Sequence, residues 1–157
     1  MPARTMIRLS TAGIGFFFVI LAFFGFASIS DETVVGGGLR GGNDTDLLWS
    51  LFSVNTVLNF IHLLFGSLTV MSGLVIDRTR MLVWTMCGAF GVLLVYDIVL
   101  LAFRTGTDPL AINQADTWLH AIAAVLLAVL AVMAAKEDRT RRSASSASSP
   151  GRQDNRP

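Results

Sequence analysis

Two histidines stand at matching positions in two related segments, and their side chains are the ones best suited to chemistry. Residues 54–62 read VNTVLNFIH and residues 112–120 read INQADTWLH, so that Asn55 matches Asn113 and His62 matches His120. Imidazole exchanges protons near neutral pH and is the commonest metal ligand in proteins. The pattern therefore points to proton exchange, or to the binding of a haem or a transition metal, at His62 and His120.

Two carboxylates and an arginine complete the set of candidate residues. Asp116 precedes His120 by four residues and so shares its face of a helix, while Asp97 and Arg104 lie in and just after another apolar run. Either carboxylate can orient an imidazole ring by hydrogen bonding. We expect these side chains to form a polar layer in the outer third of a helical bundle: Asn55, Asn59, His62, Asp97, Arg104, Asn113, Asp116 and His120.

The elements that position this layer are four membrane-spanning helices. The 157-residue chain is 53% hydrophobic and 15% charged, with a mean hydropathy of +0.62, and such a composition is typical of membrane proteins. A span needs about 20 apolar residues, and continuous apolar runs favour helices over barrel strands. We predict an all-α, four-helix transmembrane domain over residues 1–135, with spans at 9–28, 55–76, 81–103 and 115–135.

A helical wheel places the polar side chains and the small residues of the second span on one stripe, which runs from Asn55 to Gly73. Polar groups avoid lipid and small residues let helices approach closely, so this stripe and its counterpart in the fourth span should face protein. His62, His120 and Asp97 then all lie roughly 21–24 Å from one membrane edge, at 1.5 Å per residue. The small residues expected to pack between helices are Gly66, Gly73, Gly88, Gly91, Ala124 and Ala131.

The repeat predicts that spans one and two correspond to spans three and four, as two parallel two-helix units related about the membrane normal. Arginine and lysine gather before span one, between spans two and three, and after span four. This distribution predicts that both termini are cytoplasmic, in the cell membrane. A cleaved signal peptide is the alternative for span one, because Arg4 and Arg8 precede it and Gly25-Phe26-Ala27 resembles a cleavage site.

The segments outside the spans carry few motifs. Residues 31–46 are rich in glycine and acidic side chains and predict a flexible outer loop. Residues 136–157 are predicted to form a disordered cytoplasmic tail. Its basic start at Lys136–Arg142 either keeps this end of the chain on the cytoplasmic side or binds the membrane surface. A net charge of +1 argues against nucleic acid as a partner.

The functional interpretation stays open at this point. There is no nucleophile elbow, no Cys-x-x-Cys and no His-Glu-x-x-His, which disfavours an enzyme. The polar layer is interpreted as structural or as a site for a small ligand. The alternatives are a haem or metal site, a proton or small-solute pathway in a homo-oligomer, and a scaffold for another membrane protein.

The segments NFIHLLFG at 59–66 and INQADTWLH at 112–120 resemble a bacterial family of four-helix membrane proteins known as a domain of unknown function. In that family an Asn-x-x-His-Leu segment opens the second helix and a Val-Asn-x-x-Asp-Asn-x-x-His-like segment opens the fourth. Arg80, Gly88, Gly91 and Tyr96 fit the middle portion, while Thr117 replaces the asparagine beside the aspartate. The resemblance covers about residues 52–135 and implies the four-span fold and the same polar positions, without a reaction.

Overall fold

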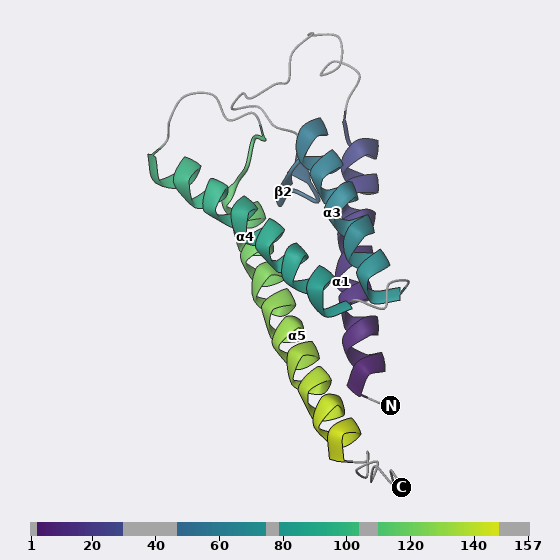
Figure 1. Ribbon diagram of the computed structural model, residues 1–157. Helices are drawn as coiled ribbons and strands as arrows, with labels where there is room; N and C mark the ends of the chain where they lie inside the picture. Colours follow the sequence, from purple (N-terminus) through teal and green to yellow (C-terminus); the bar gives the residue numbers. More distant parts are fainter. Residues whose placement is uncertain (1–2, 30–46, 75–78, 104–109, 148–157) are drawn as a thin grey trace, which may run out of the picture.

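Four long helices make up most of the computed structural model, which describes residues 3–29, 47–74, 79–103 and 110–147 (Figure 1). Each of the four is long and apolar enough to cross a membrane, as the hydropathy pattern predicts. The chain is therefore an all-α, multi-pass membrane protein. The helices are α1 (Ala3–Ala27), α3 (Thr56–Leu74), α4 (Thr79–Phe103) and α5 (Gln114–Ala147).

The helices pair into two hairpins. α1 packs mainly against α3, and α4 mainly against α5, while the contacts between these pairs are fewer (Figure 1). We call α1 with α3 the first hairpin and α4 with α5 the second hairpin. Two such units are what the predicted two-helix repeat requires.

The first hairpin is held by close contact between helix backbones. A Cβ atom added at Gly15 would lie 2.5 Å from the carbonyl oxygen of Gly66, and one added at Gly66 would lie 2.8 Å from the carbonyl oxygen of Gly15. A Cβ at Gly73 would lie 2.5 Å from the carbonyl oxygen of Arg8. Only glycine fits at these three positions, so α1 and α3 approach each other as small residues permit in membranes.

Arg8 closes the same hairpin at the end where α3 terminates. Its Nε–H donates to the carbonyl oxygen of Gly73 at 2.8 Å, and a terminal N–H donates to that of Leu74 at 2.5 Å. The last carbonyl groups of a helix have no partner within the helix. The guanidinium group of α1 satisfies two of them and fixes the register of the two helices.

The second hairpin is held instead by larger apolar side chains. Val83, Phe90, Leu127 and Ala131 are all fully buried, and Ala124 packs against the same core.

Gly88 and Gly91 do not act as the predicted packing residues. A Cβ atom at either position would meet nothing within 4 Å, and Gly88 is exposed. The physical reason is their place on the helix, because the contact face of α4 is set by Val83, Met86 and Phe90. At 100° per residue Gly88 points to the other side of the helix.

The outward faces of all four helices carry large apolar side chains, which fits a bilayer environment. In a soluble protein such side chains would be mostly inside. The most exposed examples include Phe23, Phe60, Val92 and Val125.

α5 continues to Ala147, which corrects the prediction of a disordered tail from residue 136. Arg141 Nε donates to Glu137 Oε1 at 3.0 Å, one helical turn away, and a pair at this spacing supports a solvated helix. Tail residues 148–157 and the predicted outer loop at 31–46 lie outside the described residues.

A short antiparallel ribbon precedes α3. Strand β1 (Leu47–Leu48) pairs with β2 (Phe52–Ser53), so that Leu47 faces Ser53. The turn between the strands places Trp49 and Ser50 at φ 54° and 57°, a conformation that usually recruits Asn or Gly. Because neither residue is present there, the sequence gives no hairpin signal at this point.

Candidate functional site

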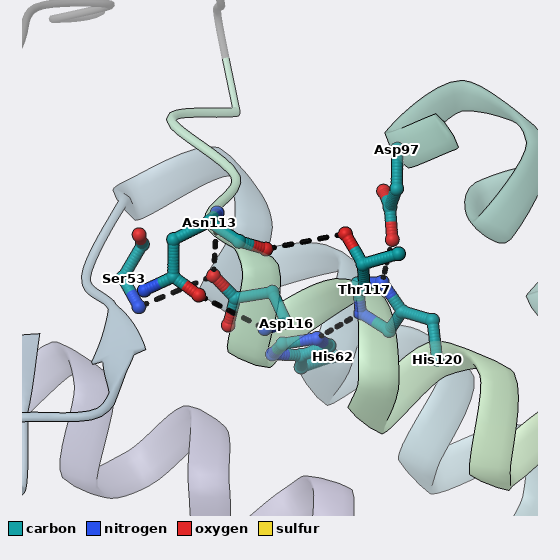
Figure 2. Close-up of polar contacts among 7 residues, drawn as sticks. All are labelled: Ser53, His62, Asp97, Asn113, Asp116, Thr117 and His120. Carbon is teal, nitrogen blue, oxygen red and sulfur yellow. Dashed lines mark hydrogen bonds and ion pairs between the residues drawn. The ribbon is translucent and has the colours of Figure 1, made fainter. Parts of the chain in front are cut away.

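The two predicted histidines meet between the hairpins. Nε2 of His62, on α3, lies 2.9 Å from Nε2 of His120, on α5 (Figure 2). The side chains are buried, with 2% of His62 and none of His120 exposed. One imidazole must therefore donate its proton to the other, in a direct hydrogen bond across the hairpin boundary.

Asp97 extends this contact into α4. Its Oδ2 atom lies 2.6 Å from Nδ1 of His120, and both side chains are fully buried (Figure 2). A separation this short is typical of a charge-assisted hydrogen bond. The structure thus brings together three of the predicted residues in one hydrogen-bonded line, which we call the Asp97–His120–His62 chain.

The two ends of this chain are buried without a hydrogen-bond partner among the described residues. They are Oδ1 of Asp97 and Nδ1 of His62. Buried polar atoms are nearly always paired, because an unpaired one loses its interactions with water without replacement. The ends are therefore the positions at which a proton or a water molecule would be accommodated.

Two aromatic rings pack beside the histidines, Phe18 from α1 and Phe90 from α4. The ring centroid of Phe18 lies 5.2 Å from that of His62 and 4.6 Å from that of Phe90. Phe90 in turn lies 6.4 Å from His120. Such surroundings lower the local dielectric and strengthen each hydrogen bond of the chain. Sequence reasoning missed Phe18, which is one of many phenylalanines in an apolar run and carries no distinguishing signal.

Asp116 hydrogen-bonds to backbone amides rather than to a histidine. Its Oδ2 atom accepts hydrogen bonds from Ser53 N at 3.2 Å and from Asn113 N at 3.1 Å, while Asp116 N donates to Asn113 Oδ1 at 3.0 Å (Figure 2). This reciprocal pair is a capping box at the start of α5. Asn113 Nδ2 also donates to the carbonyl oxygen of Leu51 at 2.8 Å. Ser53 and Leu51 were not predicted, since they contribute backbone groups.

The asparagines of the repeat have matching roles. Asn55 Oδ1 accepts hydrogen bonds from Val57 N at 2.8 Å and Leu58 N at 3.3 Å and so caps α3, as Asn113 caps α5. Asn59 is buried and faces Gly25 of α1, and its Nδ2 has no hydrogen-bond partner among the described residues. The remaining predicted residue, Arg104, lies outside the part of the chain that the structure describes.

The histidine pair does not have the geometry of two axial ligands of a haem. Two imidazoles on opposite sides of a haem iron would hold their nitrogen atoms about 4 Å apart, twice a metal–nitrogen bond of ~2 Å. The observed 2.9 Å is a hydrogen-bond distance between rings in contact. In the described ranges no group of three His, Cys, Asp or Glu residues is arranged to hold a metal ion.

Comparison with known proteins identifies a family. No curated protein and no solved structure matches the chain. A family profile, "Domain of unknown function (DUF4383)", matches residues 8–133, which include most of α1, all of α3 and α4, and α5 as far as Met133. The chain therefore belongs to the DUF4383 family of unknown function.

Proposed function

We propose that this protein binds and relays a proton within the membrane, through the Asp97–His120–His62 chain. The observation that carries the proposal is a buried carboxylate and two imidazoles joined by contacts of 2.6 Å and 2.9 Å. A proton that moves along these contacts exchanges the donor and acceptor roles of the two Nε2 atoms. Ionisable groups inside a membrane are costly and commonly mark such relays.

A proton fits this site better than a larger ligand does. His120 lies at hydrogen-bond distance from both Asp97 and His62, and all three side chains are at most 2% exposed, which leaves no space along these contacts for a solute. Uptake of a proton needs only a lone pair, and the Nδ1 atom of His62 and the Oδ1 atom of Asp97 are buried without partners among the described residues. All three groups belong to one copy of the chain, so no second subunit is required.

The relay also lies where it can affect the arrangement of the hairpins. The bond between the histidines crosses from the first hairpin to the second. Two further bonds cross beside it, from Ser53 N to Asp116 and from Asn113 to the carbonyl of Leu51. A change in the number of protons bound by the Asp97–His120–His62 chain therefore acts on the contact that joins the two hairpins.

Nitrogen-15 NMR of histidine-labelled protein in lipid nanodiscs tests this proposal. The sequence contains two histidines, so every labelled nitrogen belongs to the site. We expect a scalar coupling between the two Nε2 atoms, and chemical shifts that change with pH as the pair takes up a proton. Asp97→Asn should keep the coupling and abolish the change with pH, because the amide still accepts from Nδ1 but carries no charge.

Asp116→Asn is the matched control, since this carboxylate binds Ser53 N and Asn113 N rather than a histidine. It should leave the pH response in place. Chemical shifts of the unmodified protein that stay constant as the pH is changed would refute proton binding, even if the coupling is present.

We further propose that both chain ends lie on the cytoplasmic side of the cell membrane. α1 begins and α5 ends at the same end of the bundle (Figure 1), and the arginines at that end support a cytoplasmic location. A C-terminal green fluorescent protein fusion should fluoresce, and a C-terminal alkaline phosphatase fusion should be inactive. An active phosphatase fusion and a non-fluorescent protein fusion would instead place the C-terminus on the outer side of the membrane.

A further inference from the structure

A cavity of about 770 Å³ lies between the hairpins, at the end of the bundle where α1 begins. This end is opposite to the Asp97–His120–His62 chain, so the cavity is independent of the proposed relay. Its walls come from both hairpins: α1, α4 and α5 line it with Arg4, Ile7, Arg8, Arg80, Met81, Trp84, Thr85, Ala134, Glu137, Asp138 and Arg142.

The charges of the lining favour an anion. Four arginines line the cavity against two carboxylates, Glu137 and Asp138. Arg8 is engaged with the end of α3, whereas Arg80 and Arg142 are exposed and belong to α4 and α5, the two helices of the second hairpin. α1 and α4 both begin beside the cavity, and the positive ends of their helix dipoles add to the attraction.

The other part of the lining is apolar and favours a lipid over a small inorganic ion. Met81 is 64% exposed and Trp84 is 45% exposed, and both line the cavity beside the arginines. Tryptophan is enriched where the hydrocarbon core meets the headgroups. Basic pockets between transmembrane helices are suited to the headgroups of anionic lipids.

We infer that this cavity binds one anionic phospholipid, with the phosphate between Arg80 and Arg142 and the glycerol and first acyl carbons along Met81 and Trp84. A phosphate group is common to a lipid headgroup and to free phosphate. The apolar side of the cavity distinguishes the two, since only the lipid has carbon to bury there.

Native mass spectrometry of the full chain tests the inference, with phosphatidylglycerol, phosphatidylcholine and inorganic phosphate as probes. We expect tighter binding of phosphatidylglycerol than of phosphatidylcholine. Arg80→Gln and Arg142→Gln should each weaken phosphatidylglycerol binding about fivefold, and the double variant about 25-fold, as expected from the attraction of one basic side chain to an anionic headgroup.

The matched control is the double variant Lys136→Gln with Arg139→Gln. It removes the same charge from exposed positions of α5 that do not line the cavity, and its affinity should change less than twofold. A helical circular dichroism spectrum like that of the unmodified protein shows that each variant is folded. If the Arg80→Gln, Arg142→Gln double variant is not folded, the two single variants test the inference.

Three results would overturn the inference. Equal binding of the two phospholipids would remove the role of the anionic charge. Equal weakening by the control variant would show general electrostatic attraction rather than a site. Displacement of the bound phospholipid by millimolar inorganic phosphate would identify a free phosphate site.

Discussion

Replacement of Gly73 by alanine tests the packing of the first hairpin most directly. The added Cβ atom would lie 2.5 Å from the carbonyl oxygen of Arg8, 2.7 Å from Ala12 N and 2.9 Å from Ala12 Cβ. Ordinary van der Waals contact begins at 3.4 Å, so α1 and α3 would have to separate by about 0.9 Å at this point. Because the nearest atoms belong to the backbone of α1, no side-chain rotation relieves the contact.

The expected cost follows from two opposing terms. Overpacking of a close contact costs about 1–3 kcal/mol, and the rigidity of a backbone obstacle places Gly73→Ala in the upper part of that range. Alanine is favoured over glycine within a helix by up to about 1 kcal/mol. The net loss in free energy of unfolding should therefore be about 1–2 kcal/mol.

Gly88→Ala is the matched control, because a Cβ atom at Gly88 meets nothing within 4 Å. It retains the gain in helix preference without the clash, so the two variants should differ by about 2–3 kcal/mol. Reversible unfolding with sodium dodecyl sulfate in mixed micelles, followed by circular dichroism, measures both. Ala12→Gly in the Gly73→Ala background removes one of the three close contacts and should restore part of the stability.

Equal stabilities of the Gly73→Ala and Gly88→Ala variants would refute this reasoning. They would mean that α1 and α3 are not in backbone contact at Gly73. A full rescue by Ala12→Gly would contradict it in a different way, because the carbonyl oxygen of Arg8 would then be no obstacle.

Two further predictions concern the other contacts of the bundle. Asp116→Ala should speed amide hydrogen exchange at Ser53 and Asn113, because each N–H left without a partner costs about 1–3 kcal/mol. The amide of Val57, which donates to Asn55, is the control, and its exchange rate should not change. Exchange at Ser53 that stays slow in the variant would contradict the role of Asp116. Protein extracted from membranes should retain α1 in its intact mass, because cleavage after Ala27 would remove the partner of α3; a mass that lacks residues 1–27 would show that the first span is a signal peptide.

The four helices could be predicted from the sequence because the relevant signal is local and strong. A span needs only an uncharged run of sufficient length, and the ends of α4 agree closely with the predicted span at 81–103. The end of α5 was harder to predict, since Lys136–Arg142 reads as polar tail although its residue types favour a helix in water. Hydropathy reports the membrane boundary and does not report where a helix ends.

The site could be predicted only in part, for a different reason. The repeat and the helical period identify His62 and His120 as equivalent residues on buried faces. They do not say which carboxylate a histidine meets, because this depends on how α4 rotates against α5. Asp116 is nearer to His120 in sequence, yet the partner is Asp97. The predicted packing role of Gly88 was wrong for the same reason, because the sequence does not say which face of α4 turns toward α5.

The ribbon before α3 has a consequence for the order in which the molecule is assembled. Its backbone groups at Leu51 and Ser53 bind Asn113 and Asp116, which are synthesised only after α4 is complete. The α1–α3 pair can form while the ribosome is still producing α4, because its contacts lie within the first half of the chain. The ribbon reaches its final hydrogen bonds only when α5 enters the membrane, so insertion of the last helix fastens a segment made much earlier.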